Sequence, residues 1–217
     1  MKILASILDW RDEFTRKRIH VKEYDYISSF YQARLNTKAL KLDEPTFEFD
    51  KSYSSKINGM VSEDIREVIH ETVYAYPQET IAFNCFDFAM MAQKALKVNL
   101  NIDTVLTLGS YSDGGTKLFY ESLAKLKFRL RNPHYESEGI NLHAWLTLPD
   151  WKIIDVSILS ALKLFGEFQD YDYRNFYYMD AKEQRNNNHL LAYHPILIGN
   201  DYLNKIRLKP KILLTIH

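Results

Sequence analysis

Apolar residues recur three and four positions apart over the first half of the chain, which is the spacing of a buried helical face. This pattern predicts a helical segment from Ile3 to about Leu40. It also predicts a helix that Ser62 caps and Pro77 ends, with acidic residues in its first turn. A further helix begins after Asn84, and its predicted buried face consists of Phe88, Met91, Ala92, Ala95 and Leu96.

Short β-rich runs dominate the second half, bounded by glycine, proline and polar residues. They predict strands over 103–108 (ending at Gly109), 142–148, 151–158, 190–198 and 209–216. The pair around Pro149-Asp150 has the form of an antiparallel hairpin. The segment 117–131 is predicted to be an amphipathic helix or a long excursion, and 160–168 a short helix.

Helices that come first and strands that come later predict an α+β fold. The length of 217 residues suits one compact unit. We divide it into an N-terminal helical extension over 1–60 and a main domain over 61–217. The sequence contains no internal repeat.

The single cysteine, Cys85, lies at the predicted start of the helix that follows Asn84. A thiol at this position is near unpaired backbone N–H groups and the positive end of the helix dipole, a setting that favours the reactive thiolate. A lone cysteine is also commonly a small buried hydrophobic residue. Position alone leaves both interpretations open.

Charge and composition exclude several classes of function. Lysine plus arginine and aspartate plus glutamate number 28 each, so no bulk charge favours nucleic acid or an anionic membrane. The basic cluster 16–18 is interrupted by nearby acids and is expected to be a solvated helix face rather than a nucleic-acid patch. One cysteine excludes an internal disulfide framework. No stretch approaches about 18 uncharged apolar residues and the N-terminus lacks the features of a signal peptide, so we expect a cytoplasmic protein with no membrane segment.

A nucleophilic thiol needs a base within hydrogen-bonding distance and a third group that orients the base. His143, near the start of a predicted strand, and Asp155, on the next strand, are the candidates. A charged aspartate among Ile153, Ile154 and Val156 is costly to bury unless it accepts hydrogen bonds. A two-residue turn would place the two side chains on opposite faces, because side chains alternate along a strand. We therefore expect a three-residue loop or a bulge, with His143 directly opposite Asp155.

These residues resemble the transglutaminase-like superfamily. The pattern is a cysteine at a helix start, a histidine two positions before a tryptophan, and an aspartate that closes the next strand. Cys85, His143, Trp145 and Asp155 match it in order and type, over about residues 80–160. Asn84 departs from the pattern, since glycine is common at that position. The resemblance implies a papain-like core, with the cysteine helix packed on an antiparallel sheet, and arylamine N-acetyltransferases form a related branch.

By this resemblance, Cys85 is the nucleophile, His143 the general base and acid, and Asp155 the residue that orients the imidazole. The Cys85 backbone N–H and one side-chain donor would hold the oxyanion. Gln78 is a candidate for that donor, although an exposed glutamine after Pro77 is an equal alternative. Trp145 is a tentative substrate contact, but packing beside the site is the more common use of such a residue.

The expected function is cysteine-dependent acyl chemistry on a peptide, protein or small amide, by hydrolysis or by transfer to an amine. The alternative is a non-catalytic binding module whose cleft or N-terminal helices hold a protein partner. We expect no cofactor and no metal, since His189, His194 and His217 lack partners with metal-ligand spacing. The tyrosine-rich stretch 171–178 is expected to pack in the core or surface, with a cleft lining as the alternative. The substrate and the oligomeric state are left open.

Overall fold

The computed structural model describes residues 25–50, 52–57, 60–113, 116–133, 139–166, 170, 172–182 and 191–206. Much of the predicted helical segment upstream of residue 25, the turn at 114–115 and the strand at 209–216 lie outside these residues. The described helices and strands follow one another in the order α2 (Tyr26–Ala39), β1 (Lys56–Ile57), β2 (Met60–Val61), α3 (Glu63–Val73), α4 (Gln78–Ala82), α5 (Cys85–Leu100), β3 (Val105–Asp113), β4 (Thr116–Leu118), α6 (Leu123–Arg131), β5 (His143–Thr147), β6 (Lys152–Asp155), α7 (Ile158–Leu164), β7 (Tyr177–Asp180), β8 (Leu191–Ile198) and α8 (Asp201–Lys205).

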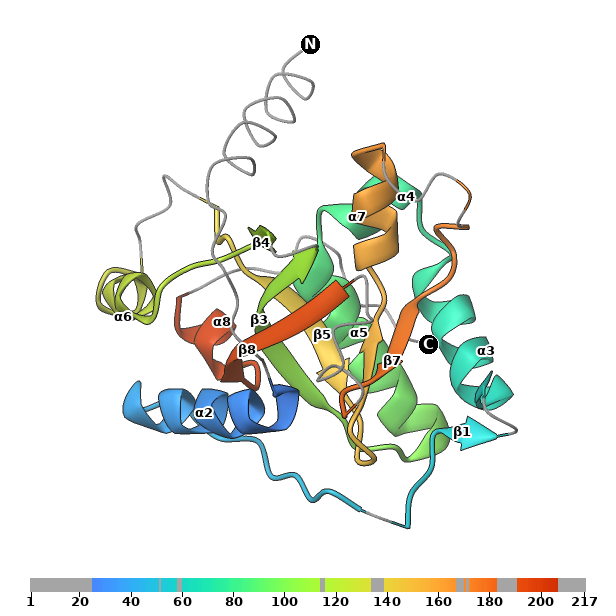
Figure 1. Cartoon of the computed structure of the whole chain (residues 1–217), viewed down its shortest axis with the longest axis horizontal. Coiled ribbons are helices and arrows are strands. Elements are labelled where there is room, and N and C mark those ends of the chain that lie inside the picture. The colour runs from blue at the N-terminus through green and yellow to red at the C-terminus, as the bar shows by residue number, and fades with distance from the viewer. Residues whose placement is uncertain are drawn as a thin grey trace.

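The larger of the two sheets in the described residues organises the fold and is antiparallel at every pairing, so the predicted α+β class is confirmed. Its main path runs β4-β3-β5-β6-β7, and β8 pairs with β3 (Figure 1). On one side, β3 pairs first with β5 and then, beyond Gly109, with β4. β1 and β2 form a separate two-stranded pair.

Two hydrophobic cores cover opposite faces of this sheet. On one face, the apolar sides of α3 and α5 pack against strand residues such as Leu106, Ala144 and Ile154. On the other face, Tyr26 and Phe30 of α2 pack with residues of α7 and with the alternate residues of the strands. The part of the N-terminal extension that the structure describes therefore belongs to the same folded body as the sheet (Figure 1).

The segment between α2 and β1 runs past the turn that joins β5 to β6. Phe49 stacks on Trp151 with ring centroids 3.4 Å apart. The Asp150 carboxylate accepts hydrogen bonds from the backbone N–H and the hydroxyl of Ser55, at 2.9 and 2.8 Å. These contacts fix the turn at its tip, far along the hairpin from His143.

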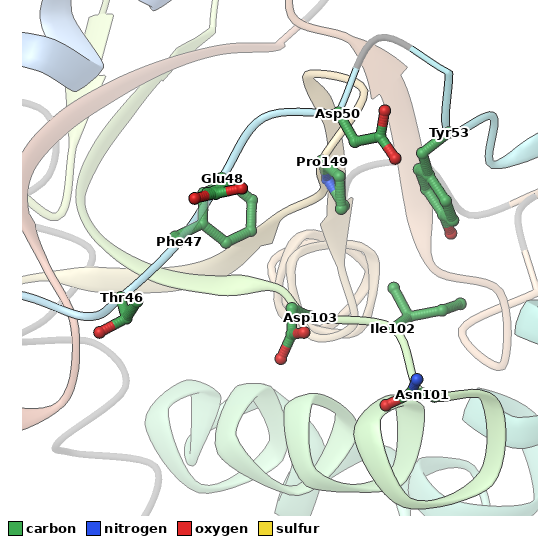
Figure 2. A pocket seen from close by; sticks show the side chains of 9 residues that line it. All are labelled: Thr46, Phe47, Glu48, Asp50, Tyr53, Asn101, Ile102, Asp103 and Pro149. Atoms are coloured by element: carbon green, nitrogen blue, oxygen red, sulfur yellow. The ribbon is translucent and has the colours of Figure 1, made fainter.

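A hollow of about 420 Å³ opens between this segment and the residues that join α5 to β3. Figure 2 shows side chains from both segments and Pro149 around it. Its lining residues are Thr46, Phe47, Glu48, Asp50, Tyr53, Asn101, Ile102, Asp103 and Pro149. None of them belongs to the predicted triad.

The described part of the predicted helical segment over 3–40 is α2, which begins at Tyr26, because Asp25 has an extended backbone and its carboxylate accepts the Ile27 N–H. Two other predicted elements differ from the structure. The strand predicted to end at Gly109 continues to Asp113, since Gly109 lies at a register shift against β8 and does not end the strand. The predicted helix over 117–131 forms only as α6, from Leu123, because the preceding residues pair with β3 as β4.

Candidate active site

Cys85 is the first residue of α5, as the sequence predicted. The predicted apolar face of this helix is fully buried, which fixes the helix against the sheet. The Asn84 side chain does not cap the helix. Its amide donates to the Thr80 carbonyl oxygen at 2.7 Å, back into α4. Cys85 as a residue is only partly buried.

The hairpin that carries His143 and Asp155 has the predicted odd loop. Leu148 N–H donates to the Lys152 carbonyl oxygen, so the loop consists of three residues, Pro149 to Trp151. Trp151 takes a left-handed backbone conformation with φ +65°, typical of the last residue of such a loop. The prediction of an odd loop is confirmed.

The predicted direct opposition of His143 and Asp155 is wrong. Thr147 pairs with Ile153, and this register places Trp145 opposite Asp155, with His143 two residues further along. The loop begins at Pro149, one residue later than direct opposition of His143 and Asp155 requires. The residue opposite Asp155 is therefore two positions further along β5. Residues two positions apart on a strand point to the same face of the sheet. The His143 and Asp155 side chains therefore still lie on one face and contact each other diagonally.

The structure brings His143 and Asp155 into direct contact. His143 Nε2 lies 2.5 Å from Asp155 Oδ2, and both side chains are buried. The Cys85 side chain is close enough to His143 to help raise the pKa of the imidazole. Because Nε2 faces the carboxylate, Nδ1 is the ring nitrogen left for the thiol. The arrangement is thus a thiol, an imidazole and a carboxylate in series.

Asp155 is fully buried and accepts several hydrogen bonds besides that of His143. Its Oδ1 accepts the backbone N–H groups of Ser157 and Ile158, both at 3.0 Å, at the start of α7. Its Oδ2 accepts the Tyr193 hydroxyl at 2.9 Å. These donors compensate the cost of burying a carboxylate and hold its position.

Tyr193 is a site residue that the sequence analysis did not identify. It lies on β8 and is fully buried, and burial together with the Asp155 charge raises the pKa of its hydroxyl well above the ordinary value. Its hydroxyl is therefore a neutral donor to Asp155. A tyrosine inside a predicted apolar strand was the available signal, because a buried phenol needs a hydrogen-bond partner.

Aromatic rings enclose the imidazole of His143. Phe119 is stacked on it, with centroids 5.3 Å apart and planes inclined by 22°. Tyr111 meets it edge-on at 5.8 Å, and Trp145 lies at 6.2 Å. Phe119 was also not predicted, because its contact depends on how β3 and β4 pair.

Gln78 and Trp145 have other contacts in the structure. Gln78 begins α4, and one of its amide N–H groups donates to the Ser160 carbonyl oxygen of α7 at 3.2 Å. Trp145 is fully buried, and its indole N–H donates to the Tyr26 hydroxyl at 2.9 Å. Packing beside the site is what the structure describes for Trp145. The oxyanion role of Gln78 and the substrate contact of Trp145 stay predictions.

The charge state of His143 follows from its neighbours. Burial lowers its pKa, but the charge and hydrogen bond of Asp155, with a smaller effect of Cys85, outweigh burial and raise the pKa from 6.5 to about 10. The imidazole is therefore predominantly protonated at neutral pH. The paired charge of Asp155 makes this possible in a buried place.

This pKa predicts how stability depends on pH. Because the folded pKa exceeds the ordinary 6.5, the stabilisation is complete below pH 6.5 and is lost as pH rises toward about 10. We expect the His143 contribution to the free energy of unfolding to fall across this range by up to about 1.4 kcal/mol per pH unit. Urea unfolding at several pH values would measure it. The slope should be shallower in His143→Gln, and equal slopes would contradict the prediction.

Possible ligands for a metal do not converge in the described residues. No group of three histidine, cysteine, aspartate or glutamate side chains lies together there. His194 is buried on β8, with Nε2 2.8 Å from the Ser112 hydroxyl. His189 and His217 lie outside the described part of the chain.

Comparisons with models of protein families, with curated proteins and with solved structures give no match to this chain. Among the helices that the structure describes, none has the length and apolar character needed to cross a membrane.

Proposed function

We propose that this chain performs cysteine-dependent acyl chemistry, with Cys85, His143 and Asp155 as a catalytic triad. The observation that carries the proposal is the position of His143, between a buried carboxylate and a thiol at a helix N-terminus. The substrate is a peptide, a protein or a small amide. A cytoplasmic location would keep the thiol reduced.

The first half-reaction forms a thioester. Attack starts from an ion pair in which His143 Nδ1 holds the proton, stabilised by the Asp155 charge, and the Cys85 sulfur attacks the carbonyl carbon as the thiolate. The tetrahedral intermediate collapses, the C–N bond breaks, and the amine leaves with the proton from His143. The Cys85 backbone N–H at the start of α5 is a donor for the oxyanion. The second N–H of the Gln78 amide is the candidate for the other donor.

The second half-reaction regenerates the enzyme. Water or an amine gives a proton to His143 and attacks the thioester carbonyl, and the C–S bond breaks. His143 keeps the proton, which restores the ion pair with the thiolate, and an acid or a new amide is released. Hydrolysis is the primary proposal, and transfer to an amine is its near variant.

We also propose the finer fold assignment, a papain-like core of the transglutaminase-like type. Its support is the placement of three residues in chain order: cysteine at a helix start, histidine at a strand start and aspartate at the end of the next strand. The helix packs on an antiparallel sheet, as that core requires.

The test uses a generic acyl donor, p-nitrophenyl acetate, because the natural substrate is unidentified. We expect an acetyl adduct on Cys85, seen by intact-protein and peptide mass spectrometry after rapid acid quench, and released by hydroxylamine. Adding a primary amine should speed deacylation and yield the acetylated amine if transfer occurs. Cys85→Ala is the control that must lose the adduct.

Two outcomes would contradict the proposal. One is acetylation of lysine side chains with none on Cys85. The other is alkylation of Cys85 by iodoacetamide only above about pH 8, at the rate of a model thiol. Either result would favour the non-catalytic binding module.

A further inference from the structure

Phe119 has a backbone conformation that needs an explanation. Its φ is +55°, in the left-handed region that a bulky residue adopts only when its surroundings enforce it. The strain places its ring, buried at 7% exposure, against the face of the His143 imidazole. Strained residues of this kind concentrate at functional sites.

A buried ion pair lies next to this segment, between Glu121 and Arg129 of α6. Arg129 Nε and Nη2 donate to the two carboxylate oxygens of Glu121, at 3.1 and 3.0 Å, and both side chains are buried. The bidentate pair fixes the direction of its planar partners. It thereby ties the segment that follows Phe119 to α6.

The same ion pair binds the segment that leads into β5. Glu121 Oε1 accepts the Asn141 backbone N–H at 2.9 Å, and Arg129 Nη2 donates to the Gly139 carbonyl oxygen at 2.9 Å. The Asn141 side-chain amide donates to the Tyr120 carbonyl oxygen at 3.3 Å. These bonds connect the segment 119–121, which carries Phe119, to the segment 139–141, which ends two residues before His143.

We infer that Phe119 is a positioning residue of the triad, held by the Glu121–Arg129 pair so that its ring fixes the plane of the His143 imidazole. This role rests on the proposed function. An aromatic face attracts a cation, so the stack favours the protonated ring and aligns Nδ1 with Cys85. The titratable groups that contact His143 are Cys85 from α5, Asp155 from β6 and Tyr111 from β3.

The test replaces Phe119 by leucine, which keeps the site apolar but removes the ring. NMR titration of the His143 Cε1–H should show a pKa lower by about half to one unit. Acetylation of Cys85 by p-nitrophenyl acetate should slow about 10-fold. Phe119→Tyr should restore both values. Phe128→Leu, at a half-exposed position on α6, is the matched control and should change neither.

Arg129→Lys tests the Glu121–Arg129 ion pair without changing the Phe119 ring. It is also the second test if circular dichroism shows that Phe119→Leu does not fold. It keeps the charge but loses the bidentate bond, so the His143 pKa should move in the same direction by less. Unchanged His143 titration in folded Phe119→Leu, or in Arg129→Lys if only that variant folds, would overturn the inference. The NMR readout does not need catalysis, so it separates this inference from the proposed function, which fails if wild-type Cys85 is not acylated.

Discussion

His143→Gln is expected to slow acylation of Cys85 by p-nitrophenyl acetate on the order of 10⁴- to 10⁶-fold, the range in which loss of a triad base falls. The amide of glutamine cannot take the thiol proton. Release of p-nitrophenol in a stopped-flow burst, together with the mass of the acyl adduct, measures the rate.

The matched control is His70→Gln, on the exposed side of α3. It should acylate at the wild-type rate. If His143→Gln stays within a factor of about 10 of the wild type, His143 is not the base, and the contact with Asp155 has a structural role only.

Asp155→Ala is expected to have the largest effect on stability, a loss of about 3–5 kcal/mol in the free energy of unfolding. The substitution leaves the buried His143 without its counter-charge. It also removes the acceptor for Tyr193 and for the two N–H groups at the start of α7. Urea unfolding measures the loss, and Asp103→Ala, an exposed ion-pair partner of Lys97, should change stability by less than about 1 kcal/mol.

Asp155→Asn separates the structural role from the chemical one. It keeps the shape and one oxygen acceptor but directs an amide toward His143 or Tyr193. We expect a smaller loss of stability with acylation slowed on the order of 10⁴-fold, as when a triad aspartate becomes an amide. Full activity in folded Asp155→Asn would show that the carboxylate charge is not needed.

Local residue chemistry was enough to predict the elements that carry the site. The buried face of α5 follows from its spacing, and the odd loop between Leu148 and Lys152 follows from requiring His143 and Asp155 on one face. Direct opposition did not follow, because face alternation determines only whether the register is odd or even. Where the three-residue loop begins depends on which residue can take a positive φ at its last position, and in the structure this residue is Trp151.

Contacts between distant strands could not be predicted, because they depend on registers that no local pattern specifies. Gly109 illustrates this. A side chain there would overlap the His194 carbonyl oxygen and come within 2.8 Å of the Trp145 ring. The glycine is required for close packing of β3, β5 and β8, not to end a strand. The positions of Tyr193 and Phe119 depend on the same packing, so the sequence did not reveal them.

The three-residue turn at Pro149–Trp151 has a consequence for insertions and deletions. Loops far from an active site usually tolerate a change of length. Here, one residue more or less would exchange inward and outward positions along β6 relative to β5. Asp155 would then leave the side of the sheet that His143 occupies, although no residue of the triad had been altered. Loop length at this tip is therefore as specific a requirement for the site as the identity of its side chains.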